Sequence, residues 1–200
     1  MGDDSEVAIR AARDHGDMQE VVRLALDVYK VEIYSFLCAR LGAESDAHEV
    51  FSQVSEDLWR GMDGFAWRCS LRTWLYTLAR HAAVRFERSP ANQGGRHRPL
   101  SGVSEPAAAA ERSRTRPYLR TEVKDRFAAI RSTLTPDEQT LLVLRVDRDL
   151  AWDDVARILH DDPAADDESI RRLASNLRQR FRQLRERLRE KARAEGLLDE

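Results

Sequence analysis

Apolar residues recur at three- and four-residue steps through residues 71–86, and this spacing constrains the fold more than any other feature of the chain. The repeat consists of Leu71, Leu75, Leu78, Ala82 and Phe86. An α-helix places residues with this spacing on one face, so we expect them to form one buried stripe. Ser70 is the expected N-cap of this helix, because its hydroxyl can accept a hydrogen bond from a first-turn N–H.

A second helix is expected directly before this one. Asp46 can cap its N-terminus, and Glu49 stands three residues later, which is the spacing of a capping box. We expect the helix to reach Arg60 and to end at Gly61, since glycine is common just beyond a helix C-terminus. Residues 61–69 then form a loop with two glycines, two aromatics and an arginine. A loop of this composition could hold an unstacked base.

A long helix and a tail are expected on the N-terminal side. Residues 1–16 are predicted to be a flexible N-terminal tail. Apolar residues are then dense from Asp17 to Leu41, and Gly42 is the expected helix terminator. Together with the two helices after it, this segment predicts a three-helix domain over residues 17–88.

Residues 89–117 are rich in Pro, Gly, Ser and Arg and have no apolar periodicity, so we expect a flexible linker. A second helical domain is predicted over residues 118–196. Its first segment is amphipathic to Leu134, and Thr135 followed by Pro136 is typical of a capped helix start. Residues 147–150 are an expected turn, and residues 152–159 a short helix. The predicted fold class is therefore all-α, with two small helical domains.

Charge is distributed unevenly along the second domain. The whole chain has a net charge of −2, 42% hydrophobic residues and 34% charged residues, which is typical of a soluble protein with limited cores. Residues 171–193 contain ten Lys/Arg against two Glu, whereas residues 136–170 contain three Arg against eleven Asp/Glu. The near-neutral total therefore hides one strongly basic helix. No apolar run approaches the length of about 20 residues that a membrane span needs.

Residues that could support catalysis or metal binding do not form a recognisable pattern. The sequence has no glycine-rich phosphate loop, HExxH, CxxC or GxSxG motif, and its five histidines have no ligand spacing. Cys38 and Cys69 are far apart, which suits a reducing cytoplasm, and the expected localisation is cytoplasmic. We therefore predict no enzyme activity, no cofactor and no metal site.

Three segments resemble a known family. The run DAHEV at residues 46–50, Trp59, and SLRTWLYTLAR at residues 70–80 are similar to region 2 of bacterial RNA polymerase sigma factors. They are most similar to the extracytoplasmic-function (ECF) group. Residues 134–159 resemble the start of sigma region 4, which leads into a helix-turn-helix in that family. Residues 175–188 resemble the recognition helix, with an expected core stripe of Leu177, Phe181, Leu184 and Leu188.

The resemblance implies an ECF-type sigma factor that binds core RNA polymerase and directs promoter recognition, DNA melting and transcription initiation. Its partners would be core RNA polymerase and promoter DNA, and an anti-sigma factor is left open. The expected polymerase-binding residues are Asp46, Glu49, Gln53 and Glu56. The expected DNA-binding residues of region 2 are Asp63, Phe65, Trp67, Arg68, Arg72, Trp74, His81, Arg85 and Arg88. Those of region 4 are Ser175, Asn176, Arg178, Gln179, Arg182 and Arg185.

Helical spacing leaves two interpretations of these aromatic and basic residues open. Trp74, His81, Arg85 and Arg88 share a stripe beside the apolar seam, and a basic stripe with an aromatic can contact phosphates and bases. Aromatics at helical spacing are also common in cores, and arginines on a helix face are commonly solvated. The arginines near the C-terminus are equally compatible with a solvated or coiled-coil helix.

The sequence also departs from the family pattern. Ser52 and Ser55 occupy positions where the clamp-binding helix usually has a glutamine and an aromatic. His81 and Arg85 replace the usual asparagine and aspartate. After Leu159 the chain inserts HDDPAADDESIRRLA, which includes an acidic run. The alternative prediction is therefore a sigma-derived protein-interaction module without initiation activity.

Overall fold

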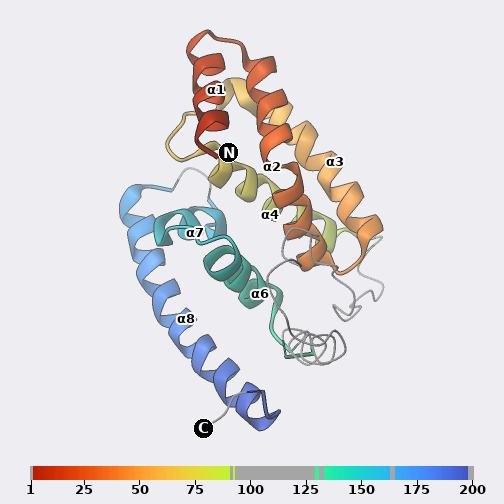
Figure 1. Cartoon of the computed structure of the whole chain (residues 1–200), viewed down its shortest axis with the longest axis vertical. Helices are drawn as coiled ribbons and strands as arrows, with labels where there is room; N and C mark the ends of the chain where they lie inside the picture. The colour runs from red at the N-terminus through yellow and green to blue at the C-terminus, as the bar shows by residue number, and fades with distance from the viewer. Residues whose placement is uncertain (1, 91, 93–128, 131–132, 163–164, 198–200) are drawn as a thin grey trace. The chain divides into compact units, whose positions relative to one another are not determined.

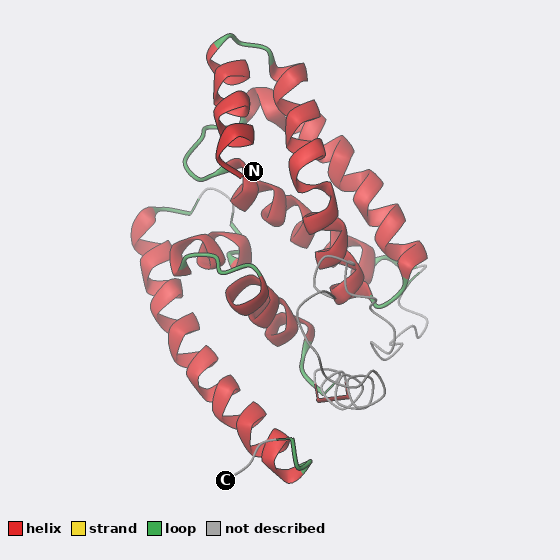
Figure 2. Cartoon of the chain, viewed as in Figure 1, coloured by secondary structure: helices red, strands yellow, loops and turns green. Residues whose placement is uncertain are grey.

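The computed structural model describes residues 2–90, 92, 129–130, 133–162 and 165–197, and in these ranges every regular element is helical (Figures 1 and 2). The predicted all-α fold class is confirmed. The chain divides into two compact units, Met1–Arg96 and His97–Glu200. The predicted linker, except for residues 89, 90 and 92, and the amphipathic segment predicted at 118–128 lie outside the described residues.

The first unit is built around helix α2. It contains four α-helices, α1 (Gly2–Asp14), α2 (Met18–Leu41), α3 (Glu44–Gly61) and α4 (Leu71–Arg88), and the short 3₁₀ helix η1 (Met62–Gly64). Helix α2 packs against each of the other three, and α3 also packs against α4. The largest fully buried side chains of this core include Phe36, Leu37, Leu58, Leu75 and Tyr76.

Capping residues define three ends of these helices, of which the caps at Gly42 and Ser70 were predicted and the cap at Asp17 was not. The Asp17 carboxylate accepts a hydrogen bond from the Glu20 N–H at 2.9 Å. Gly42 ends α2 in the left-handed conformation with φ 73°, where a side chain would be strained. The Ser70 hydroxyl accepts a hydrogen bond from the Thr73 N–H at 3.0 Å. The start of α2 and α4 and the end of α2 are therefore confirmed.

The capping box predicted at Asp46 and Glu49 is wrong. Helix α3 begins at Glu44, and its N-cap Ala43 makes no side-chain hydrogen bond. The reason is packing, because Ala47 is fully buried and its N–H already donates to the Ala43 carbonyl at 3.0 Å. The helix must therefore include the turn before residue 47.

The first 14 residues differ most from expectation in this unit. Residues 2–14, which were predicted as a flexible tail, form helix α1 and pack against α2. Ile9 is only 1% exposed, and the Tyr29 hydroxyl of α2 donates a hydrogen bond to the Glu6 carboxylate. Burial, together with that carboxylate, raises the pKa of Tyr29. A single anchoring isoleucine gives little periodicity, so the sequence pattern did not reveal this helix.

The second unit contains α6 (Pro136–Leu142), a π-helical turn η3 (Val143–Asp147), α7 (Trp152–Leu159) and α8 (Asp167–Ala194). Helix α8 packs against α6 and α7. The short helix predicted at 152–159 is confirmed. The predicted core stripe of α8 is buried at Leu177, Phe181 and Leu184, while Leu188 is half-buried. Within the described ranges, no helix combines the length and apolar character that a membrane span needs.

Helix α8 is longer at its N-terminus than expected. The sequence allowed one further helical turn at Ser169–Ala174 before the predicted recognition helix at Ser175, but α8 begins at Asp167 and has 28 residues. Asp166 caps it by accepting a hydrogen bond from the Ser169 N–H at 2.7 Å. Ile170 and Ala174 are buried, so the inserted segment supplies two further turns of the helix. Residues 160–166 connect α7 to α8, which is longer than the usual three or four residues of a helix-turn-helix.

The start of α6 is a complete capping box. The Thr135 hydroxyl accepts a hydrogen bond from the Glu138 N–H at 3.3 Å, and the Glu138 carboxylate accepts one from the Thr135 N–H at 3.0 Å. Arg187 of α8 donates to the same carboxylate at 2.5 Å. Burial opposes the charged form of Glu138, but the bonds from Thr135 and Arg187 outweigh it, so the pKa of Glu138 is lowered.

Glu138→Gln should therefore destabilise α6 in a pH-dependent way. We expect a loss of about 0.5–1 kcal/mol at pH 7, because an ion pair and a charged cap are weakened. A carboxylate with a lowered folded-state pKa stabilises the fold above its unfolded pKa, and this contribution disappears as the pH falls through the folded pKa. Amide hydrogen exchange in α6 at pH 7 and at lower pH measures this. Glu190→Gln, an exposed change on α8, is the control, and a pH-independent loss for Glu138→Gln would contradict the prediction.

Candidate nucleic-acid interface

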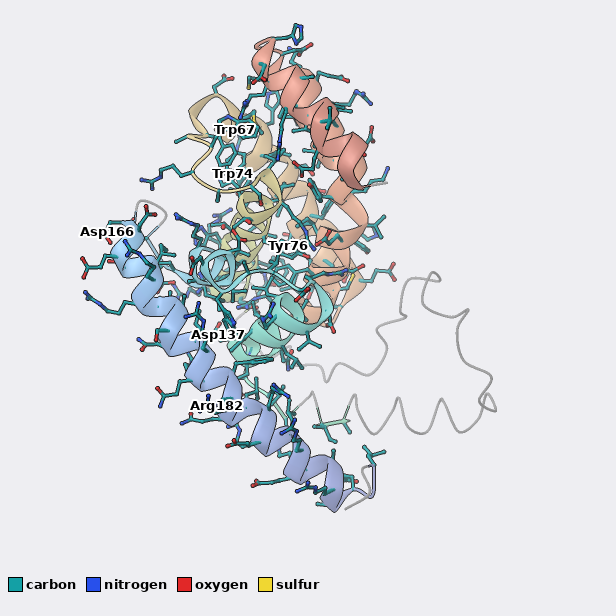
Figure 3. The ribbon with its side chains drawn as sticks, turned by 60° about the vertical axis from the view of Figure 1, so that its left-hand side comes forward. Trp67, Trp74, Tyr76, Asp137, Asp166 and Arg182 are labelled. Atoms are coloured by element: carbon teal, nitrogen blue, oxygen red, sulfur yellow. The ribbon has the colours of Figure 1, made fainter. Side chains whose placement is uncertain are left out.

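Three aromatic rings form a cluster where the loop after η1 meets the start of α4. The rings of Phe65 and Trp74 are stacked, with centroids 4.3 Å apart and planes at 9°. Trp67 packs against Phe65 with centroids 4.8 Å apart and planes at 48°. Figure 3 shows Trp67 and Trp74 close together at this end of the first unit. We call Phe65, Trp67 and Trp74 the aromatic cluster.

Gly61 allows this cluster to lie close to the end of α3. A Cβ atom added at Gly61 would lie 3.0 Å from the Cζ2 atom of Trp74, which is tighter than most real Cβ contacts. The glycine that was predicted from sequence as a helix terminator therefore also provides space for an indole. A larger residue at this position would push Trp74 away from α3.

The backbone of Trp67 has an unusual conformation. Its φ is 55°, in the left-handed region that favours glycine. A residue held in such a conformation costs about 1–3 kcal/mol, so surrounding contacts must maintain it. Its ring contacts are Phe65 and Arg13, whose Cζ atom lies 4.9 Å from the ring centroid. Strained residues cluster at functional sites, which makes Trp67 a candidate for a direct role.

The predicted residues on either side of the cluster differ in exposure. Asp63 and Arg68 of the loop are exposed, while Phe65 and Trp67 are half-buried. Along α4, Trp74 and His81 are half-buried and Arg85 and Arg88 are exposed. The Arg85 guanidinium bonds to the Asp57 carboxylate of α3. Arg88 stands 14 residues after Trp74, which corresponds to about 21 Å along a helix. The loop and the distal end of α4 are therefore separate parts of the predicted surface.

Arg72, which was predicted to contact DNA, makes an internal ion pair. Its Nε donates to the Glu32 carboxylate of α2 at 2.8 Å, and the buried Tyr76 hydroxyl donates to the same carboxylate at 2.7 Å. Burial opposes the charged form of Arg72, but Glu32 outweighs it and the pKa of Arg72 is raised. This geometry favours a role in joining α2 to α4, and a DNA contact by Arg72 stays a prediction.

Helix α3 presents a polar face. Of the residues predicted to bind polymerase, Glu49, Gln53 and Glu56 are exposed and Asp46 is half-buried. At the C-terminal end of the helix, Trp59 is 53% exposed. In the sequence, Trp59 contributed only to the resemblance to sigma region 2, and no role was predicted for it. Trp59 directly follows Leu58, the last buried residue of the α3 stripe, and this position alone indicates that Trp59 lies off the stripe.

An arginine-rich groove lies on the second unit. Its volume is about 380 Å³, and its lining residues are Arg145, Trp152, Arg178, Phe181, Arg182, Arg185, Glu186 and Arg189. Trp152 packs edge-on against Phe181 at 5.6 Å, and the guanidinium of Arg178 lies 6.0 Å from the Trp152 ring centroid. In the described part of the chain, Arg178, Arg182, Arg185 and Arg189 pair with no carboxylate. We call these four residues, which line the groove, the unpaired arginines of α8.

The other predicted region 4 residues lie outside this groove. Ser175, Asn176 and Gln179 are exposed on α8 and do not line it. The first turn of α8 carries Asp167 and Glu168 beyond the cap Asp166 (Figure 3). In a typical helix-turn-helix, the N-terminal residues of the second helix reach base edges. Here that end of the helix is acidic, and the arginines that line the groove begin at Arg178, about three turns later.

A known protein family matches most of the first unit. The model of the sigma-70 region 2 family matches residues 26–91, which include most of α2 and all of α3, η1, the aromatic loop and α4. Residues 26–91 are therefore similar to a sigma-70 region 2 domain. All of the predicted polymerase-binding residues and all of the predicted region 2 DNA-binding residues lie within this domain. Helix α1 and the whole second unit lie outside the match.

Two curated relatives extend the comparison. The chain is similar to the ECF RNA polymerase sigma factor SigG of Mycobacterium tuberculosis, strains CDC 1551 / Oshkosh and ATCC 25618 / H37Rv, with 31% identity over 81 residues in each case. The aligned part is 40% of this chain and 20% of each relative, so the chain spans about a fifth of the relatives' length. The resemblance of the region 2 domain to ECF sigma factors is confirmed.

Proposed function

We propose that this chain is an ECF-type sigma factor that binds core RNA polymerase and directs promoter recognition, DNA melting and transcription initiation. The region 2 match over residues 26–91 carries this proposal. In it, the polar face of α3 binds polymerase, the aromatic cluster holds a base of the melted strand, and the unpaired arginines of α8 hold the upstream duplex.

The aromatic cluster supports the role in melting. Stacking on an aromatic side chain is a sequence-tolerant way to hold an unpaired base, because every base has a π-face. Trp67 is kept in a strained conformation beside Phe65, and the exposed Arg68 follows it. A base that stacks on Trp67 would bring its own phosphates toward this arginine.

The unpaired arginines support duplex binding through phosphates. Four guanidinium groups along one side of α8 have no carboxylate partner among the described residues, whereas Arg172 and Arg187 bind Glu168 and Glu138. Like charges held together repel one another, and a polyanion relieves that repulsion. The acidic first turn of α8 disfavours entry of that end into a groove, so contacts with phosphates are favoured over base readout.

Run-off transcription tests the proposal. Purified full-length chain would be added to core RNA polymerase from the same host, with fragments of the host genome as templates. We expect discrete transcripts that require the chain. A set of templates that gives no chain-dependent transcript, under conditions where the chain binds core polymerase, would contradict initiation activity.

Two features of the second unit favour a second function. The acidic start of α8 and the long α7–α8 connection suit a protein-binding module that no longer recognises duplex DNA. Binding of the full chain to duplex promoter fragments at several salt concentrations separates the two functions. Each phosphate contact adds about 0.9 to the salt slope on B-DNA, so an initiation factor should show a steep slope. A chain that binds core polymerase but shows no salt-dependent duplex binding would support the module.

Trp59→Ala should weaken binding to core polymerase. An exposed tryptophan beside a polar face resembles the aromatic anchors of protein interfaces, so we expect a loss of about 1–2 kcal/mol. Glu49→Arg should also weaken binding, through charge reversal on the same helix. The control is Val31→Ala, because Val31 is 59% exposed on α2 and no role is proposed for it. Titration of core enzyme with labelled chain measures the effect, and equal affinities for Trp59→Ala and Val31→Ala would rule out the anchor.

A further inference from the structure

Helix α1 brings one side chain to the aromatic cluster. The guanidinium of Arg13, in the last turn of α1, covers one face of the Trp67 ring with its Cζ atom 4.9 Å from the centroid. The Asp14 carboxylate accepts hydrogen bonds from Nε and an Nη atom of Arg13 at 2.8 and 2.7 Å. Helix α1 lies outside the region 2 match, so the comparison gives Arg13 no role.

A base that stacks on Trp67 would compete with Arg13 for a face of the Trp67 ring. Stacking requires an open ring face, and the described contacts of Trp67 occupy the ring with Phe65 and Arg13. Phe65 is itself stacked against Trp74, so its displacement would break a second ring contact. Arg13 is the easier group to displace, since its side chain is 37% exposed and its salt-bridge partner Asp14 is its neighbour in the chain. The guanidinium can therefore leave the ring and stay bound to Asp14.

We propose that Arg13 covers the Trp67 ring in the free protein and is displaced when a nucleotide base stacks on that ring. This inference rests on the proposed base-binding function of the aromatic cluster. In this proposal α1 is part of the site, because its residue Arg13 competes with the base for the Trp67 ring. Exposed cation–π contacts are weaker than base–aromatic stacking, so the base wins the competition.

Binding of fluorescein-labelled single-stranded DNA to the full chain, with and without core RNA polymerase, tests the inference. We compare Arg13→Ala with Arg10→Ala, which removes the same charge from the same helix at an exposed position. Removal of the competitor should make Arg13→Ala bind about two- to five-fold more tightly than Arg10→Ala. Arg13→Lys keeps a cation that can contact the ring, and it should restore wild-type affinity.

The outcomes separate this inference from the proposed function. If Arg13→Ala binds no more tightly than Arg10→Ala while Trp67→Ala loses binding, Arg13 is not a competitor and the base site stands. If Trp67→Ala binds as the wild type does, or no variant binds in either arm, the base site fails and the inference fails with it. A merely structural role predicts lower stability for Arg13→Ala and no gain in affinity.

Discussion

Trp67→Gly should weaken open-complex formation about 5- to 150-fold, because loss of one aromatic–base stack costs about 1–3 kcal/mol. Binding to core polymerase should not change, since Trp67 lies in the loop and not on the polar face of α3. Fluorescence of 2-aminopurine placed in the non-template strand reports melting, and titration with core enzyme reports binding. A loss of core binding would mean that Trp67 has a structural role.

The backbone of Trp67 provides a matched control. Its φ of 55° is unstrained for glycine and strained for alanine. Trp67→Ala and Trp67→Gly should therefore melt DNA equally poorly, while the glycine variant is more stable by about 1 kcal/mol. Hydrogen exchange in α4 would measure that difference. If the glycine variant melts DNA much better than the alanine variant, loop conformation and not ring stacking limits melting.

Glu32→Ala should lower the stability of the first unit by about 2–4 kcal/mol. The variant removes the counter-charge of Arg72 and the acceptor of the fully buried Tyr76 hydroxyl. A buried polar group without a partner costs about 1–3 kcal/mol, and a partly buried charge without its pair adds to that cost. Amide hydrogen exchange in α2 and α4 measures the loss, with α8 of the same molecule as an internal reference.

Two further variants serve as comparisons for Glu32→Ala. Asp27→Ala removes an exposed carboxylate of α2 whose salt bridge is solvated, so it should cost less than about 0.5 kcal/mol. Arg72→Met should lower stability and leave the salt slope of duplex binding unchanged. A variant at Arg72 with normal stability and a reduced slope would instead identify a phosphate contact.

Local chemistry made much of the helical fold predictable. Ser70 and Thr135 each cap the helix that their side chains indicated, because a cap bonds to a backbone N–H only a few residues away. The α4 stripe was predicted at Leu71, Leu75, Leu78, Ala82 and Phe86, of which Leu71, Leu75 and Ala82 are buried and Leu78 and Phe86 are half-buried. In each case, the information lies within one or two helical turns of sequence.

Helix α1 was missed, and α8 begins earlier than predicted, because distant contacts decide both. Ile9 alone anchors the apolar side of α1, and its partner surface lies on α2. The extension of α8 depends on Ile170 and Ala174, which are buried in the second unit. An acidic, proline-containing insertion gives no local sign of these contacts. Tertiary packing therefore overrides a weak local pattern.

The sequence by itself determined most of the helices (α1 is the exception), the starts of α2, α4, α6 and α7, and that aromatic and basic residues gather near the start of α4. Only the tertiary structure decided which of those residues are available to a partner. Arg72 is engaged by Glu32 of α2, and Trp67 is covered by Arg13 of α1, although neither partner is near in sequence. The physical reason is that helix periodicity fixes the face on which a side chain lies, whereas the ion pairs and ring contacts made on that face come from other helices.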